Sequence, residues 1–326
     1  MCFLAFRAAP KSRLPQNKAN LPHKMSLKSV VLAILSLTFL CSRAELISQD
    51  PHPQILRVMT YNTWYVFAKG KAEDLGKQWI ASQSPDIVAL QELTSIQPEK
   101  LEQLSASWHH SHSSLLKTQG FSVGLTSRFP ITVIEKKVKG MHHGFLHAKV
   151  QGLHFFVIHL SPFDWRIRSQ EAQTLLGKIN PLLQSGQQVI VLGDFNASCS
   201  SDKKWLDQNT ELLNKTAESD HTHAHHQNLK EGKFDYSVME QFFGAGLIDT
   251  TLSFLPDDPS QRLSFPSGIL SGKKSAPERG ERIDFILSSK KLAQRVHHSK
   301  IVTKGIVNQI SDHFPVITDF QRPFAQ

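Results

Sequence analysis

Cysteine is scarce in this sequence. Of the three cysteines among 326 residues, Cys2 and Cys41 precede residue 45, which leaves only Cys199 in the rest of the chain. A lone cysteine excludes an internal disulfide beyond residue 44. Because 40% of the residues are hydrophobic, the chain has enough apolar material to hold a core together by packing.

The apolar run near the N-terminus, residues 30–41, is too short to span a membrane. It has about a dozen residues, whereas a helix needs about 20 to cross a bilayer. Lys28 precedes the run and Ser42-Arg43-Ala44 follows it, an arrangement typical of a secretory signal peptide cleaved after Ala44. We therefore expect residues 1–44 to be an N-terminal extension plus signal (core signal 25–44), residues 45–326 to form a single domain, and the mature protein to be secreted or periplasmic.

The mature chain also lacks a strong excess of positive charge. The whole sequence has a net charge of +9, but residues 1–44 contain seven Lys or Arg and no acid. Without them, 30 basic residues face 28 acidic ones, a net charge of about +2. Because proteins hold nucleic-acid phosphates largely with Lys and Arg, this balance is weak support for a dedicated DNA-binding protein.

The stretch 189–196 (VIVLGDFN) is an aliphatic run that ends in polar residues. Its first four residues, three of them β-branched, predict a strand buried on both faces. Since side chains alternate along an extended chain, Asp194 and Asn196 are expected on one side and Phe195 on the inner side. Gly, Asp and Asn are also common turn residues, so this stretch alone leaves an ordinary turn open.

The same pattern recurs along the chain. Other apolar strands carry a carboxylate, an amide or an imidazole at an end: LRVMTYN at Asn62, DIVALQE at Glu92, FFVIH at His159, RIDFIL at Asp284, and Asp312-His313 before FPVI. A soluble core does not need a polar group at the end of each strand. A convergent polar site is the simpler explanation.

Helical stretches alternate with these strands. The apolar spacing predicts helices over 69–82, 98–107 and 161–183, and short strands over 121–125, 131–134 and 144–150. Residues 200–234 are polar and are expected to be a long surface segment with a short helix over 204–213. We find no repeat and no linker, so the order predicts an α/β sandwich with helices outside and sheets inside.

The motifs TYN, LQE, HL, GDFN, RIDFI and SDHFPV, in this order, resemble those of the endonuclease/exonuclease/phosphatase superfamily. Its members include pancreatic-type deoxyribonuclease, abasic-site endonucleases and bacterial neutral sphingomyelinases. The resemblance runs from Leu56 to about Ile317, and the combination of motifs is highly specific. It implies a DNase I-like four-layer α/β sandwich, two packed β-sheets flanked by helices, and a metal-dependent phosphoesterase.

The resemblance implies a metal site at Asn62, Glu92 and Asp312. Carboxylate oxygens are the ligands that Mg²⁺ prefers, and Mg²⁺ takes only one or two carboxylates from protein. Mn²⁺ and Ca²⁺ are alternative ions. Trp64 stands where some members carry a second metal-binding aspartate, which favours one ion.

The resemblance also implies catalytic roles at five positions. His313 would be a general base or a phosphate contact, with Asp284 fixing its orientation. Asp194 would contact the attacking water and Asn196 the phosphoryl oxygens. His159 would donate to the phosphate or assist the leaving group, although by itself it could also be a core histidine.

Substrate contacts are predicted from residues that flank the motifs. His143 lies near the position where deoxyribonucleases place a phosphate-contacting arginine, and Trp165 and Arg166 could stack on the leaving group. Packing of Trp165 under the helix is the alternative. The histidine-rich run 221–226 is flanked by polar residues and is interpreted as an exposed loop outside the active site.

These patterns favour a Mg²⁺-dependent phosphodiesterase that acts as a monomer on a phosphate ester, which is a nucleic acid, a phospholipid head group or a small phosphodiester, without a stable protein partner. A non-specific endonuclease, a sphingomyelinase-like or phosphoinositide-directed lipid enzyme, and a catalytically inactive binding module are alternatives. The lipid enzyme predicts an exposed apolar loop, for which Phe242, Phe243 and Leu255 are candidates. The intact set of charged residues argues against the inactive module.

Overall fold

The computed structural model describes residues 55–271 and 280–322. The predicted signal segment and its cleavage after Ala44 lie outside the described residues. All described residues fall within one compact unit, Pro53–Gln326. No helix in this part of the chain is both long and apolar enough to cross a membrane.

The described strands form two six-stranded sheets and a small hairpin. The first sheet has the order β13-β14-β1-β2-β4-β3, with β1 Ile55–Asn62, β2 Ile87–Gln91, β3 His112–Leu115, β4 Gly124–Ser127, β13 Val296–Ile301 and β14 Val316–Gln321. The second has the order β11-β12-β8-β7-β6-β5, with β5 Thr132–Lys137, β6 Phe145–Val150, β7 Leu153–His159, β8 Val189–Asp194, β11 Leu247–Asp249 and β12 Asp284–Ser289. Strands β9 Leu229–Lys230 and β10 Lys233–Phe234 form the hairpin.

The two sheets pack face to face. One buried cluster takes residues from both, including Val58 of β1, Leu146 of β6 and Leu192 of β8. These strands are apolar on both faces because each also has a helix layer on its outer side. The β1–β2 and β7–β8 pairs are parallel, and the other strand pairs of the two sheets are antiparallel.

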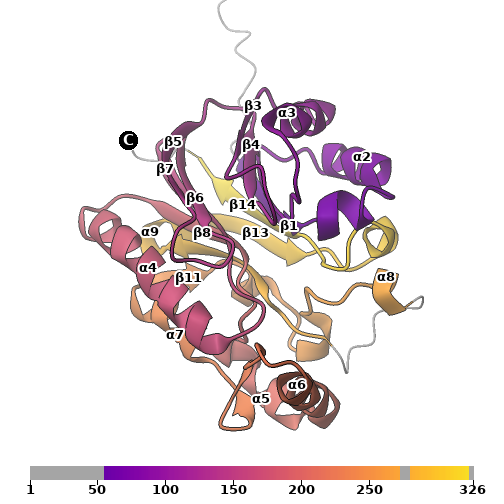
Figure 1. Ribbon diagram of the computed structural model, residues 1–326. Helices are drawn as coiled ribbons and strands as arrows, with labels where there is room; N and C mark the ends of the chain where they lie inside the picture. The colour runs from indigo at the N-terminus through magenta and orange to yellow at the C-terminus, as the bar shows by residue number, and fades with distance from the viewer. Residues whose placement is uncertain (1–54, 272–279, 323–326) are drawn as a thin grey trace, which may run out of the picture. The chain divides into compact units, whose positions relative to one another are not determined.

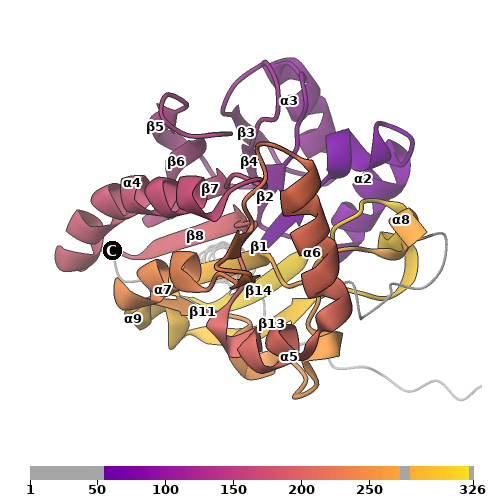
Figure 2. The same ribbon diagram turned by 60° about the horizontal axis from the view of Figure 1, so that its bottom comes forward.

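Helices cover both outer faces (Figure 1). Helices α2 Glu73–Gln83 and α3 Pro98–Ser107 pack on the first sheet, and α4 Trp165–Gln184 and α7 Ser237–Gly244 pack on the second. The shorter helices are α5 Lys203–Gln208, α8 Gly268–Ser271 and α9 Lys290–Ala293, and α6 Thr210–Thr222 packs on α5 (Figure 2). The result is the predicted four-layer α/β sandwich.

Two predicted helices begin later in the structure than in the sequence interpretation. The helix predicted from residue 161 begins at Trp165 because the side chain of Asp164 accepts a hydrogen bond from Arg166 N, which caps it. The helix predicted from residue 69 begins at Glu73. The short helix predicted over 204–213 is two helices, α5 and α6, which together run to Thr222.

A left-handed turn precedes α2. All residues from Trp64 to Lys69 have positive φ angles, between 47° and 61°. Such a run of non-glycine residues is unfavourable, at about 1–2 kcal/mol per residue. Tertiary contacts hold it: Phe67 is fully buried, and Val66 N donates to Glu92 O at 3.2 Å.

Candidate active site

Three neighbouring strands of the second sheet bring polar side chains to one edge. His159 ends β7 and Asp194 ends β8, and the parallel pairing places these residues opposite each other. Asp284, the first residue of β12, pairs with Asp194 across the antiparallel ladder. His159 Nε2 lies 3.5 Å from the Asp194 carboxylate. The strand ends therefore meet in one cluster.

The first sheet adds Asn62, at the end of β1, and Glu92, just after β2. Asn62 Nδ2 donates to Glu92 Oε1 at 3.3 Å and to Asp194 Oδ2 at 3.0 Å, so this one amide joins the two sheets. The amide oxygen of Asn62 accepts from Trp64 N at 3.1 Å. The nitrogen of Asn62, and not its oxygen, thus faces the carboxylates.

The stretch from Ser311 to His313 is a loop before β14, the condition for Asp312 and His313 to face the site together. Ser311 fixes this loop to the end of β1. Its hydroxyl donates to the carbonyl oxygen of Asn62 at 2.7 Å and accepts from His313 N at 3.2 Å. Asp312 and His313 are both buried.

His313 and Asp284 form a hydrogen-bonded pair. His313 Nδ1 lies 2.8 Å from Asp284 Oδ2, and since a carboxylate only accepts, the ring nitrogen donates. Burial disfavours the imidazolium, but the charge and hydrogen bond of Asp284 outweigh it and raise the pKa of His313 to about 10. A histidine protonated at neutral pH suits a phosphate contact better than a general base.

Negative charge exceeds positive charge around His313. Burial, and then the charge of Asp284, raises the pKa of Asp194 to about 8. Burial likewise raises the pKa of Glu92 and of Asp312. Four carboxyl groups thus surround one imidazolium.

The side chains present fit a divalent cation. Asp194 and Asp284 offer carboxylate oxygens that lie within 4.8 Å of each other and of a ring nitrogen of His313. Asp284 Oδ1 is buried and has no hydrogen-bond partner in the described part of the chain. A hard cation would supply a partner for this oxygen and reduce the repulsion among the carboxylates.

His159 has a neutral and partly unsatisfied ring. Its Nδ1 atom is buried and has no hydrogen-bond partner among the described residues. Burial, and then the nearby His143, lowers the pKa of His159 well below its usual value. The His143 ring stacks on it with a centroid distance of 4.1 Å. His159 is therefore neutral at pH 7 and able to donate one hydrogen bond.

The alternation of side chains predicted an extended chain through Asn196. The structure contradicts this prediction. Strand β8 ends at Asp194, and Asn196 has a φ of 48°. The cause is local: Asp194 Oδ1 accepts a hydrogen bond from Asn196 N at 2.9 Å, which closes a tight turn. The amide of Asn196 then donates to Leu160 O at 3.0 Å, and Phe195 is buried as predicted.

Comparison with known families agrees with this geometry. The model of the endonuclease/exonuclease/phosphatase family matches residues 59–313, most of the chain and all of the strand ends described above. The protein belongs to this family. No curated protein sequence matches the chain.

Solved structures share the fold. An AP endonuclease from Archaeoglobus fulgidus has 17% identity and a TM-score of 0.59, with 81% of this chain and 99% of that chain covered. A 3′ phosphatase from Neisseria bound to a product DNA hairpin has 17% identity and a TM-score of 0.58, with 82% and 100% covered. A 3′-5′ exonuclease from Neisseria meningitidis has 18% identity and a TM-score of 0.57, again with 82% and 100% covered. At such identities the likeness establishes the sandwich fold of this family member and not its substrate.

The predicted substrate contacts occupy different places. His143 lies against His159, inside the site. The guanidinium of Arg166 bonds to Asp164, with Nη2 2.7 Å from Oδ2, and is largely exposed. The Trp165 ring lies under Lys230 Nζ, 4.8 Å from its centroid. The contacts of Trp165 and Arg166 thus join them to their own helix start and to β9.

The sequence interpretation missed two serines that hold the site together. Ser311 connects the His313 loop to β1, as described above. Ser264 Oγ accepts from Ile283 N at 2.9 Å and from Asp284 N at 3.0 Å, and Ser264 O accepts from Phe314 N at 2.7 Å. Both serines are fully buried. Complete burial of a hydroxyl is not readable from sequence, although the position of Ser311 next to Asp312 was a signal.

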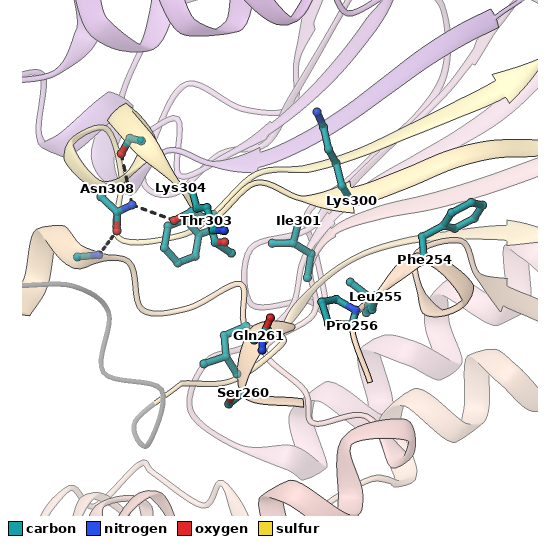
Figure 3. A pocket seen from close by; sticks show the side chains of 14 residues that line it. Phe254, Leu255, Pro256, Ser260, Gln261, Lys300, Ile301, Thr303, Lys304 and Asn308 are labelled. Carbon is teal, nitrogen blue, oxygen red and sulfur yellow. Dashed lines mark hydrogen bonds between the residues drawn. The ribbon is translucent and has the colours of Figure 1, made fainter. Parts of the chain in front are cut away.

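A separate pocket of about 830 Å³ lies beside β13 (Figure 3). Its lining includes Leu255, Ile301 and Phe314 but none of the predicted site residues. Of the residues predicted for an exposed apolar loop, Phe242 is instead a fully buried residue of α7, and Phe243 packs against the same core. Leu255 lines the pocket. The pocket is therefore next to the Ser311–His313 loop, through Phe314, but distinct from the site.

Proposed function

We propose that the protein is a secreted phosphodiesterase that uses a divalent cation, Mg²⁺ in the first instance. The observation that carries the proposal is the convergence of Asp194, Asp284 and His313, whose side-chain oxygen and nitrogen atoms lie within 4.8 Å of one another. A phosphodiester is an anion, so its hydrolysis needs charge cancelled on the phosphate, a base for the attacking water and help for the departing oxygen. The cluster offers groups for each need.

Bound Mg²⁺ would supply charge neutralisation at the phosphate. Glu92 and Asp312 are the carboxylates on the first-sheet side of the site that would hold it, and Asn62 orients Glu92 through the hydrogen bond from its amide nitrogen. The excess negative charge supports this role, since a bound cation would offset the loss of folded-state stability that buried carboxylates cause.

Asp194 is the group best suited to accept a proton from the attacking water. A base is most effective when its pKa lies near the working pH, and burial raises the pKa of Asp194 to about 8. His313, protonated through Asp284, would donate to a phosphoryl oxygen. Water oxygen then bonds to phosphorus as its proton passes to Asp194, and the bond to the leaving oxygen breaks. Neutral His159 can donate a hydrogen bond to that oxygen, which takes its proton from solvent.

The test is a hydrolysis panel with mature protein. Plasmid DNA, RNA, sphingomyelin, inositol phosphates and a chromogenic diester are each incubated with Mg²⁺, Mn²⁺ or Ca²⁺, or with a chelator. We expect turnover of at least one diester, loss of it with chelator, and a loss of about a thousandfold in Asp194→Asn, the usual scale for a group acting in the transition state. The exposed Asp257→Asn variant is the matched control. Turnover that survives both the chelator and Asp194→Asn would overturn the proposal, and no turnover of any ester would support the inactive binding module.

Secretion has its own test. Expression of the full chain in a bacterial host should yield a processed protein outside the cytoplasm whose first residue is Glu45. Recovery of unprocessed chain from the cytoplasm alone would contradict the signal peptide.

A further inference from the structure

A continuous series of rings lies against His159, and we call this series the ring arc. Its members are Tyr65, Phe121, His143, His142, Phe163 and His226, and neighbouring ring centroids lie 5.1, 5.3, 4.3, 5.2 and 5.0 Å apart in that order. His143 also stacks on His159 at 4.1 Å. The ring arc therefore passes through the active site at His143.

The ring arc is assembled from separate parts of the chain. Tyr65 follows β1, Phe121 precedes β4, His142 and His143 precede β6, Phe163 precedes α4, and His226 follows α6. The last of these belongs to the histidine-rich run that the sequence interpretation placed outside the active site. Its ring lies parallel to Phe163, with an angle of 18° between the planes. The fold thus gathers rings that the sequence keeps far apart.

Packing of the core explains only part of the ring arc. His143 is buried, but Tyr65 is 38% exposed and Phe163 is 36% exposed. Exposed aromatic rings in a continuous series, next to a polar site, are typical of a recognition surface. Core packing would have turned these two rings inward.

Backbone strain at Tyr65 is an independent observation. Tyr65 lies in the left-handed turn, with a φ of 55°, and its N–H donates to Glu92 Oε2 at 3.3 Å. Strain of this kind persists where the surrounding structure enforces it, and it concentrates at binding and catalytic sites. Here it presents an aromatic ring to solvent beside a predicted metal ligand.

We propose that the ring arc binds an unpaired nucleobase next to the scissile phosphate, so that the preferred substrate is single-stranded nucleic acid. The inference rests on the proposed phosphodiesterase function. Rings stack on the flat faces of bases at about 1–3 kcal/mol per base, whereas a hydrocarbon chain or an inositol offers no flat face. In a duplex the bases stack on each other, so their flat faces are not accessible to the rings of the protein. The near-neutral charge of residues 45–326 agrees with recognition by stacking more than by phosphate contacts.

The experiment compares three 12-nucleotide DNA probes: a single strand, the same strand in a duplex, and a strand in which base-free tetrahydrofuran residues replace all nucleosides. We expect kcat/KM on the normal single strand to exceed that on the base-free strand by between about fivefold and a hundredfold, with the duplex also a poorer substrate. Phe163→Leu and Tyr65→Leu should bring the first ratio toward one. Phe254→Leu, which changes an exposed ring beside the separate pocket, should leave it unchanged.

A binding measurement separates this inference from the proposed chemistry. The dissociation constants of fluorescently labelled normal and base-free strands are measured with Asp194→Asn protein, which needs no turnover, and the thermal midpoints of all variants are compared to check folding. Preference for the normal strand that falls in both ring variants supports the ring arc even if hydrolysis fails. Equal binding of the two strands, or a preference that both ring variants keep, overturns it.

Discussion

Two buried clusters of charge lie two residues apart along the chain, one at Arg282 and one at Asp284. The Arg282 guanidinium donates to Asp202 Oδ2 at 2.8 Å, to Ser201 Oγ at 2.6 Å and to Asp249. Arg262 Nη1 lies 3.6 Å from the other oxygen of Asp202. Two cations thus meet two carboxylates, and the charges of this cluster balance.

The cluster at Asp284 does not balance. Four carboxyl groups surround the single imidazolium of His313, and Asp284 Oδ1 has no hydrogen-bond partner in the described part of the chain. Burying charge without compensation is unfavourable, so a fold keeps such an excess only where something else compensates it. The comparison teaches that the charge balance of a buried cluster, more than its burial, separates a structural ion pair from a site that binds a cation.

Breaking the balanced cluster should have the largest effect on stability. Arg282→Met removes the cation and leaves Asp202 and Asp249 buried without a full partner, so we expect the free energy of unfolding to fall by about 3–5 kcal/mol. Urea unfolding followed by circular dichroism measures it. The control is Arg166→Met, since the Arg166 side chain is largely exposed beside its partner Asp164. Equal and small effects of both substitutions would show that the Arg282 cluster is not a structural ion pair.

Binding of a cation to the unbalanced cluster should raise the free energy of unfolding, by less than the Arg282→Met substitution lowers it. At about a hundred times its Kd, a cation that binds only the folded state adds about 2.7 kcal/mol. Mg²⁺ or Mn²⁺ should therefore raise the thermal midpoint of the native protein. The increase should shrink in Glu92→Gln, which alters a carboxylate assigned to the cation, and persist in the exposed Asp257→Asn variant. A cation that stabilises the native protein and Glu92→Gln equally would place the ion elsewhere.

The sequence predicted the polar strand ends but not the contacts that join the two sheets. The residues from Val189 to Leu192 predict a strand buried on both faces, and β8 is one. Because parallel strands end at the same edge, the polar residues at those ends had to converge. The hydrogen bond from Asn62 to Asp194 spans the two sheets, and neither local propensity nor periodicity contains such a contact.

The left-handed turn and the ring arc could not be predicted for a related reason. Aromatic and β-branched residues such as Tyr65 and Val66 disfavour positive φ, so their local preference points away from the observed backbone. Only tertiary packing overrides it: a side chain at Gly76 would collide with the Phe67 ring, so this glycine provides the space in which the turn is held. His226 likewise looked like part of an exposed run because its contact, Phe163, is far away in sequence.

The smallest expected effect is a dependence of stability on pH, caused by His110, a buried group that stays neutral. His110 Nε2 donates to Pro85 O at 2.9 Å and its Nδ1 lies 2.8 Å from the Thr126 hydroxyl, and burial lowers its pKa to about 4. In the unfolded chain the pKa of His110 is about 6.5, so the unfolded state binds the proton first as the pH falls. The protein therefore loses stability between about pH 6.5 and pH 4, and the loss reaches about 1.4 kcal/mol at pH 5.5. The free energies of unfolding of the native protein and His110→Gln, measured with urea from pH 8 to pH 5.5, should converge by that amount. The exposed His297→Gln variant should instead follow the native curve, and a constant difference between the native protein and His110→Gln would mean that His110 titrates alike in both states.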